Sequence, residues 1–136
     1  MGSGANEEMA RKILSEYRTW AVVGWSPRPA RDSHRVASFL ESRDYRVIRV
    51  NPEATGEQGC VPDLASIEEP VDVVDIFRRS ELAGVHVDEA IAIGAKAVWM
   101  QLGVLDPAAA ARAEAAGLDV VMDRCPAIDH PRMIGV

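Results

Sequence analysis

The sequence predicts an α/β protein built on a single Rossmann-like, doubly wound parallel sheet of five strands. Five short apolar segments alternate along the chain with stretches of helical hydrophobic periodicity, and glycine or proline stands at most of the junctions. The apolar segments are continuous, as in parallel strands that helices cover on both faces. With 136 residues, 48% of them hydrophobic, the chain has the size and composition of one domain, which we expect to span residues 1–136.

The expected elements follow one another with short connections. Met9, Ile13 and Tyr17 recur every four residues, which predicts a first helix over residues 6–17. Further helices are expected at residues 33–43, 82–93 and 107–116. Strands are expected at residues 19–24, 45–50, 71–77, 95–102 and 118–122. Residues 62–67 suggest one helical turn, and residues 123–136, which contain two prolines, suggest a loop with room for one more turn.

Right-handed crossover connections lead us to expect the strand order 3-2-1-4-5, with the chain reversing direction across the sheet between the first and fourth strands. Ligands of such sheets bind at the carboxyl ends of the strands, beside this reversal. The segments that end the five strands are Gly24-Trp25-Ser26, Asn51-Pro52, Phe77-Arg78-Arg79, Gln101-Leu102-Gly103 and Asp123-Arg124-Cys125-Pro126. A binding site is therefore expected among these segments.

The first of these segments has the parts of a nucleotide-phosphate site, which are a strand, a glycine turn and a helix start. Gly24 permits a tight turn, while Ser26 and Ser33 offer hydroxyls. Positive charge comes from Arg28, Arg31 and Arg35. Together with the free N–H groups of the helix start, these side chains favour an anion. An ordinary strand-to-helix turn with solvated arginines would have the same residues, so this alternative stays open.

Charge and composition exclude several classes of function. A formal net charge of −6 argues against general nucleic-acid binding, which needs a broad basic face. No apolar run approaches the ~18 residues of a membrane span, and the N-terminus, with Glu7 and Glu8, carries no secretory signal. We therefore expect a cytoplasmic protein with reduced thiols at Cys60 and Cys125. Neither cysteine belongs to a C-x-x-C pair, so no metal site is expected.

The strand ends also narrow the choice of nucleotide. The loop reads G-W-S-P-R-P and lacks the glycines of the NAD-binding motif G-x-G-x-x-G. The second strand ends in Asn51, where an NAD site would place an acidic residue for the ribose hydroxyls. Asn51 does not repel a phosphate on that ribose, and Arg78 on a neighbouring strand end can pair with such a phosphate bidentately. These residues favour a nucleotide with a phosphorylated ribose, either NADP or coenzyme A (CoA).

Five segments carry a resemblance to a known family. In chain order they read V-V-G-W-S-P-R-P-A-R-D-S-H-R-V, V-I-R-V-N-P, V-D-V-V-D-I-F-R-R, A-V-W-M-Q-L-G-V and V-V-M-D-R-C-P. Together they cover nearly the whole chain from about Ile13 to Met133 and resemble the small stand-alone CoA-binding proteins. The fold of that family is similar to the CoA-binding domain of the succinyl-CoA ligase α-subunit.

The resemblance implies how CoA would be held. It places the phosphates at Gly24-Trp25-Ser26 and at the helix start near Arg31 and Ser33. It places adenosine contacts at Asn51-Pro52 and at Phe77-Arg78. The segments of Gln101 and Cys125 are also signatures of the family. The phosphorylated histidine and nucleotide-grasp domain of the ligase have no counterpart in this chain, so the resemblance implies binding and not ligation.

The expected function is therefore the binding of CoA or an acyl-CoA, in a carrier or regulatory role, with a protein partner that the sequence does not identify. The sequence contains no recognisable acid–base constellation, which favours binding over catalysis. Two enzyme classes stay open, an NADP-dependent reductase and a CoA-thiol redox protein that uses Cys125.

Several single residues have more than one possible role. Trp25 can cover the diphosphate or the pantetheine arm, and His34 can contact a phosphate. Trp99, inside a strand, is expected in the core. Asp75 can cap a buried helix end or orient Arg78. Cys125 and His130 are close enough in sequence to form a Cys–His pair.

Overall fold

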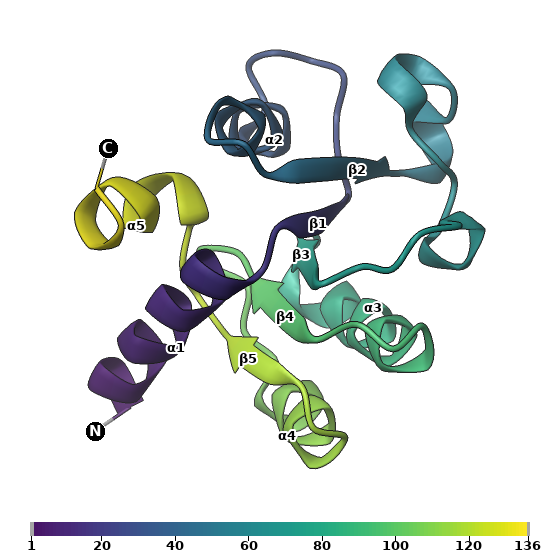
Figure 1. Ribbon diagram of the computed structural model, residues 1–136. Coiled ribbons are helices and arrows are strands. Elements are labelled where there is room, and N and C mark those ends of the chain that lie inside the picture. Colours follow the sequence, from purple (N-terminus) through teal and green to yellow (C-terminus); the bar gives the residue numbers. More distant parts are fainter. Residues whose placement is uncertain (1, 136) are drawn as a thin grey trace.

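The computed structural model describes residues 2–135 and contains a five-stranded sheet with helices on both faces (Figure 1). The strands are β1 Thr19–Val23, β2 Arg46–Val50, β3 Val73–Ile76, β4 Ala97–Met100 and β5 Asp119–Val121. The helices are α1 Gly2–Glu16, α2 Asp32–Ser42, α3 Ser80–Ala92, α4 Pro107–Ala115 and α5 Pro126–Met133. All strand pairs are parallel, which confirms the predicted fold class.

The strand order differs from the expected one. It is β2-β1-β3-β4-β5, so the third strand lies between the first and the fourth, and the expected order 3-2-1-4-5 is wrong. All four residues of β3 are buried, which suits the centre of a sheet, whereas β2 carries the exposed Arg46 and suits an edge. At an edge, β3 would have left its valines uncovered. The chain therefore reverses direction between β1 and β3.

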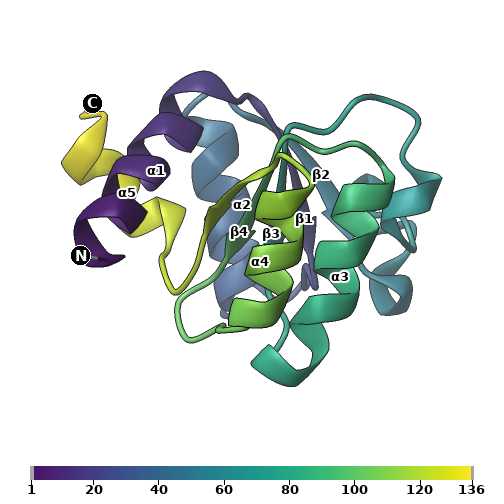
Figure 2. The same cartoon turned by 90° about the horizontal axis from the view of Figure 1, so that it is seen from below.

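Two helical layers enclose the sheet. Helices α3 and α4 cover one face, and α1, α2 and α5 cover the other (Figures 1 and 2). Trp20 and Trp99 lie fully buried in the second layer with their ring centroids 5.5 Å apart. The expected core position of Trp99 is thereby confirmed. Between β2 and β3 the chain forms three short 3-10 turns, of which Leu64–Ser66 lies within the predicted turn over residues 62–67.

The expectation of a loop over residues 123–136 is wrong, because Pro126–Met133 forms the helix α5. Pro126 occupies the start of the helix, where a missing N–H costs nothing, and Pro131 is accepted inside it. Arg124 donates to both carboxylate oxygens of Asp129, at 2.6 and 3.0 Å, and Asp129 is buried. This ion pair and the packing of α5 on α1 and α2 outweigh the local proline signal.

Gly24 brings three strand ends together. Its backbone N–H donates to the carbonyl of Val50 at the end of β2, at 2.9 Å. Its φ is +86°, and a Cβ at this position would lie 2.5 Å from the carbonyl oxygen of Phe77, just after β3. A side chain is therefore excluded by the neighbouring backbone, whatever ligand is bound. Gly117 also has a positive φ, +91°, but nothing lies within 4 Å of its Cβ position.

This difference predicts unequal effects of alanine at the two glycines. Gly117→Ala is expected to lower the free energy of unfolding by about 1–2 kcal/mol, because of its backbone conformation alone. Gly24→Ala is expected to lower it by about 1–3 kcal/mol more, because the new methyl group overlaps the carbonyl of Phe77. Urea unfolding of the two variants measures the difference. Equal losses would contradict the role assigned to Phe77.

Asp75 is a carboxyl group in the middle of the sheet. Its side chain is fully buried, and its neighbours in register are Val22 on β1 and Trp99 on β4. Burial raises the pKa of Asp75 well above its usual value, because an ionised carboxylate loses its hydration there. The folded protein therefore keeps this proton to higher pH than the unfolded chain does.

The raised pKa of Asp75 predicts that the free energies of unfolding of the wild type and Asp75→Asn differ by an amount that depends on pH. In the unfolded chain the carboxyl ionises above about pH 4, so above that pH the folded state binds more protons than the unfolded state. The contribution of Asp75 to the free energy of unfolding then falls as pH rises. The stability of Asp75→Asn relative to wild type is expected to grow from pH 4 to pH 7 in urea titrations. A constant difference across this range would contradict the raised pKa.

Candidate functional site

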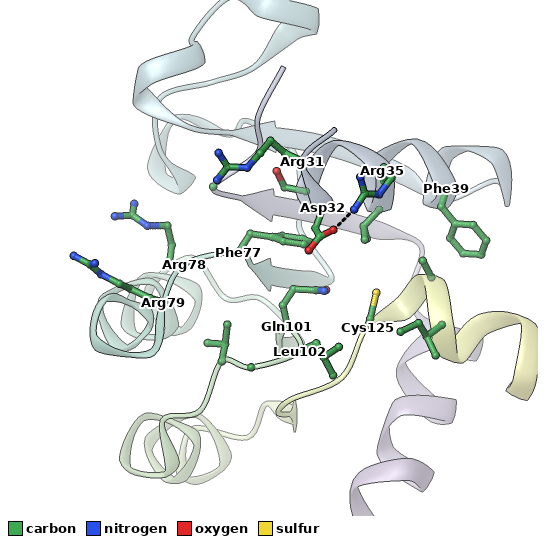
Figure 3. Close-up of a pocket in the computed structure, with 17 residues that line it drawn as sticks. Arg31, Asp32, Arg35, Phe39, Phe77, Arg78, Arg79, Gln101, Leu102 and Cys125 are labelled. Atoms are coloured by element: carbon green, nitrogen blue, oxygen red, sulfur yellow. Dashed lines mark hydrogen bonds and ion pairs between the residues drawn. The ribbon is translucent and has the colours of Figure 1, made fainter. Parts of the chain in front are cut away.

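A cavity of about 710 Å³ opens at the carboxyl ends of the strands, beside the reversal between β1 and β3 (Figure 3). This volume lies within the range of small-molecule sites in proteins. Its walls come from the strand-end segments, the first turns of α2 and the start of α5. The lining residues are Gly24, Arg31, Asp32, Ser33, Arg35, Val36, Phe39, Phe77, Arg78, Arg79, Gln101, Leu102, Gly103, Val104, Cys125, Ala127 and Ile128.

The cavity brings together many of the residues singled out from the sequence. Those that line it are Gly24, Arg31, Ser33, Phe77, Arg78, Gln101 and Cys125. Asn51 and Pro52 line a second cavity of about 260 Å³. The two cavities share Gly24 and Arg78, so they form neighbouring compartments along one edge of the sheet. Trp25, Ser26 and His34 line neither of them.

The loop before α2 is shaped by its own hydroxyl groups. The Oγ of Ser33 accepts from the backbone N–H of Ser26 at 3.0 Å, and the Oγ of Ser26 accepts from that of Arg28 at 3.1 Å. His34 Nδ1 lies 3.1 Å from the carbonyl oxygen of Ser26. These side chains therefore hold the loop in shape. The backbone N–H groups of Asp32 and Ser33 have no acceptor among residues 2–135 and are open to an anion at the helix start.

Trp25 points into the protein and lines neither cavity, whereas the sequence suggested that it could cover the diphosphate or the pantetheine arm. Its side chain is fully buried. The ring stacks on His34, with centroids 5.8 Å apart, and the guanidinium of Arg49 lies 5.2 Å from its centroid. Trp25 therefore anchors the loop before α2 to the core layer beneath that helix. The sequence could not distinguish this inward position from an outward one, because tryptophan after a strand end suits both.

Positive charge gathers at one end of the larger cavity. Arg31, Arg78 and Arg79 lie close together there (Figure 3), and within the described part of the chain none of them forms an ion pair. Arg35, farther along α2, pairs with Asp32. The unpaired arginines and the free N–H groups of α2 give this end the character of an anion site.

The opposite end of the cavity is mostly apolar, and the charged side chains beside it, Arg35 and Asp32, are paired with each other (Figure 3). Phe39 and Cys125 lie at this end in Figure 3, and Ala127 and Ile128 come from the start of α5. Two of the apolar side chains on the rim are open to solvent, Leu102 with 61% and Ile128 with 52% of its surface exposed. Ala127 and Ile128 were not expected at the site, because their segment was interpreted as a loop.

Gln101 lies between the two ends of the cavity (Figure 3). Its amide forms hydrogen bonds with Asp75 when the nitrogen faces the carboxyl, at 2.8 Å to Oδ1 and 3.2 Å to Oδ2. This orientation exchanges the amide nitrogen and oxygen that Figure 3 draws. The expectation that Asp75 caps a helix end or orients an arginine is therefore wrong, because its partner is Gln101.

Asn51 is used by the local fold. Its Nδ2 donates to the carbonyl oxygen of Trp25 at 2.7 Å, and its Oδ1 accepts from the backbone N–H of Glu53 at 2.9 Å. The smaller cavity beside it is also lined by Asp63, Arg78 and the half-buried pair of His86 and Glu89. The positive group on this cavity's lining that is not already paired is Arg78. Any phosphate bound here would depend on that arginine.

The two thiols lie apart in the sheet. Cys60 and Cys125 are both free, and they follow β2 and β5, which are the opposite edges. Burial raises the pKa of the Cys60 thiol.

His130 packs edge-on against Phe39 and Tyr45, and its buried Nδ1 has no partner among the described residues. Burial lowers the pKa of His130, and no Cys125–His130 hydrogen bond forms within residues 2–135.

No helix among residues 2–135 is long and apolar enough to cross a membrane. No group of three or more His, Cys, Asp or Glu side chains gathers there in an arrangement that could hold a metal ion.

Residues 18–131 match the family model described as the CoA binding domain. The uncharacterized protein YneT of Bacillus subtilis (strain 168) is 38% identical over 123 residues, which cover 88% of this chain and 90% of YneT. A hypothetical protein from Pyrococcus horikoshii OT3 has a TM-score of 0.89 and 37% identity, covering 95% of this chain and 92% of its own. A structure from Thermus thermophilus has a TM-score of 0.86 and 36% identity, with coverages of 93% and 98%. The chain belongs to the CoA binding domain family.

Proposed function

We propose that this protein binds CoA, with or without an acyl group, along the carboxyl edge of the sheet. The observation that carries the proposal is the division of the larger cavity. Unpaired arginines and free helix N–H groups stand at one end, and apolar side chains stand at the other. CoA has the same division, because its phosphates are at one end and its pantetheine arm and thiol are at the other.

The two cavities suggest where each part of CoA lies. The adenosine fits the smaller cavity beside Asn51 and Pro52, with Arg78 facing the phosphate on the ribose. The diphosphate then lies at the wall shared by both cavities, near Gly24 and the start of α2. The pantetheine arm follows the larger cavity past Gln101. The thiol, or an acyl group on it, reaches the apolar end.

We assign the protein a role in holding CoA and not in a reaction. Beside the expected path of the pantetheine arm, the polar side chains that line the cavity are Gln101, Cys125 and the ion pair of Asp32 and Arg35. Gln101 cannot act as an acid or a base, and the carboxylate of Asp32 is held by Arg35. A carrier or regulatory role needs a binding site with a solvent-open rim, and the exposed Leu102 and Ile128 give the site such a rim. A protein partner could approach the ligand there.

The phosphate on the ribose is expected to govern selectivity. CoA should bind about tenfold or more tightly than dephospho-CoA, because one hydrogen bond between charged groups contributes about 1.5–3 kcal/mol. In Arg78→Ala this preference should disappear. Isothermal calorimetry with CoA, dephospho-CoA and NADPH measures it. Equal affinities for the first two would remove Arg78 from this role, and tighter binding of NADPH than of CoA would overturn the proposed ligand.

The start of α2 is expected to hold the diphosphate. Arg31→Ala should weaken CoA binding about fivefold at low salt, which corresponds to about 1 kcal/mol for an exposed charge contact. The loss should shrink at high salt, because the contact is screened. Arg28→Ala is the matched control, since Arg28 lies on the same loop, is exposed and lines neither cavity. An equal loss in both variants would indicate general attraction and not a contact at this site.

A further inference from the structure

The pair formed by Asp75 and Gln101 has an unusual position, because a fully buried carboxyl meets a side chain that lines the ligand cavity. Asp75 is 0% exposed and Gln101 is 5% exposed. Strand alternation places Asp75 on the same face of β3 as Val73 and Phe77, beneath the layer of α1, α2 and α5. Gln101 follows β4 and reaches the cavity from the same face.

The carboxyl group limits how the amide of Gln101 can lie. The amide atom nearest Asp75 lies 2.8 and 3.2 Å from the two carboxyl oxygens, and the carboxyl keeps at least one accepting oxygen whether it is protonated or ionised. A nitrogen in that place therefore has an acceptor in both states, whereas an oxygen would face two acceptors whenever the carboxyl is ionised. With its nitrogen held by Asp75, the amide turns its oxygen Oε1 away from the carboxyl, toward the middle of the cavity.

A buried carboxyl at this position lowers the free energy of unfolding. Valine or isoleucine would suit a central strand between Val22 and Trp99, and neither would need a partner for a polar group. Within residues 2–135 the carboxyl forms no ion pair, and the amide of Gln101 is its hydrogen-bond partner. Any functional advantage of the carboxyl of Asp75 therefore lies in its hydrogen bond with Gln101.

We propose that Asp75 is a positioning residue, which holds the amide of Gln101 so that its carbonyl oxygen accepts a hydrogen bond from an amide N–H of the pantetheine arm. This inference rests on the proposed function and deepens it, because it names the group that recognises an amide of the pantetheine arm. Gln101 lies between the arginines and Cys125 (Figure 3), which is the part of the cavity that the arm would cross. The pair would favour ligands with an amide in this place.

A double-mutant cycle on the full chain tests the proposal. The variants are Asp75→Val, Gln101→Met and the double variant, with Asp75→Asn as the conservative control. The ligands are CoA and adenosine 3′,5′-bisphosphate, which keeps the adenosine, the 3′-phosphate and the first 5′-phosphate of CoA but has no pantetheine arm. Calorimetry gives the affinities, and circular dichroism checks that each variant folds. If Asp75→Val does not fold, Asp75→Ala replaces it, measured alone and together with Gln101→Met.

Asp75→Val and Gln101→Met are each expected to weaken CoA binding about three- to tenfold, the effect of one hydrogen bond between uncharged groups. The double variant should lose no more than Gln101→Met alone, because Asp75 acts through Gln101. Asp75→Asn should stay within about twofold of the wild type, because its carbonyl can still accept from Gln101. The bisphosphate should bind equally to wild type and all variants.

Three results would overturn the proposal while leaving CoA binding intact. They are an unchanged CoA affinity in Asp75→Val, losses that add in the double variant, and an equal loss for the bisphosphate. If Asp75→Ala has to be used, an unchanged CoA affinity in that variant, or a loss that persists in the Gln101→Met background, would have the same meaning. A wild-type protein that does not bind CoA would overturn the proposed function, and this inference with it.

Discussion

The close approach of Gly24 to the backbone after β3 is the constraint on which the site depends. At this point the N–H of Gly24 holds the end of β2, and the absence of a Cβ lets the carbonyl of Phe77 come within reach. Three strand ends therefore meet around one residue. Both cavities are built against it, since Gly24 and Arg78 line each of them. The glycine thus shapes the wall that the two cavities share.

Charge pairing explains how an acidic protein can present an anion site. Several arginines outside the cavity are held by carboxylates, as Arg46 is by Glu69, Arg112 by Asp88 and Arg124 by Asp129. The three arginines at the cavity end form no such pair in the described chain. Exposed charges farther than about 8–10 Å away are largely screened at ordinary salt. The net charge of −6 therefore says little about the local potential at the strand ends.

The sequence predicted the segments of the site better than their geometry. Continuous apolar runs ended by polar residues located the strand ends, and Gly24, Arg31, Arg78 and Gln101 all line the cavity. The strand order was wrong, because local periodicity does not encode which strands are neighbours. The helix α5 was missed, since the ion pair that holds it forms between side chains whose geometry only the folded chain fixes. Trp25 was placed outside for a similar reason, as its burial depends on the packing of α2.

The structure separates the groups that shape the site from those that are free to bind. The hydroxyls of Ser26 and Ser33 and the amide of Asn51 look like ligand-binding groups in the sequence, yet each is occupied in holding a loop. What remains free is the backbone N–H groups of the α2 start, the arginines and the apolar wall of α5. Such an arrangement keeps a site in its binding geometry without a ligand, because polar groups already satisfied by the protein do not have to reorganise when one enters. Gln101 shares in both roles, since one end of its amide is held by Asp75 and the other is left for the cavity.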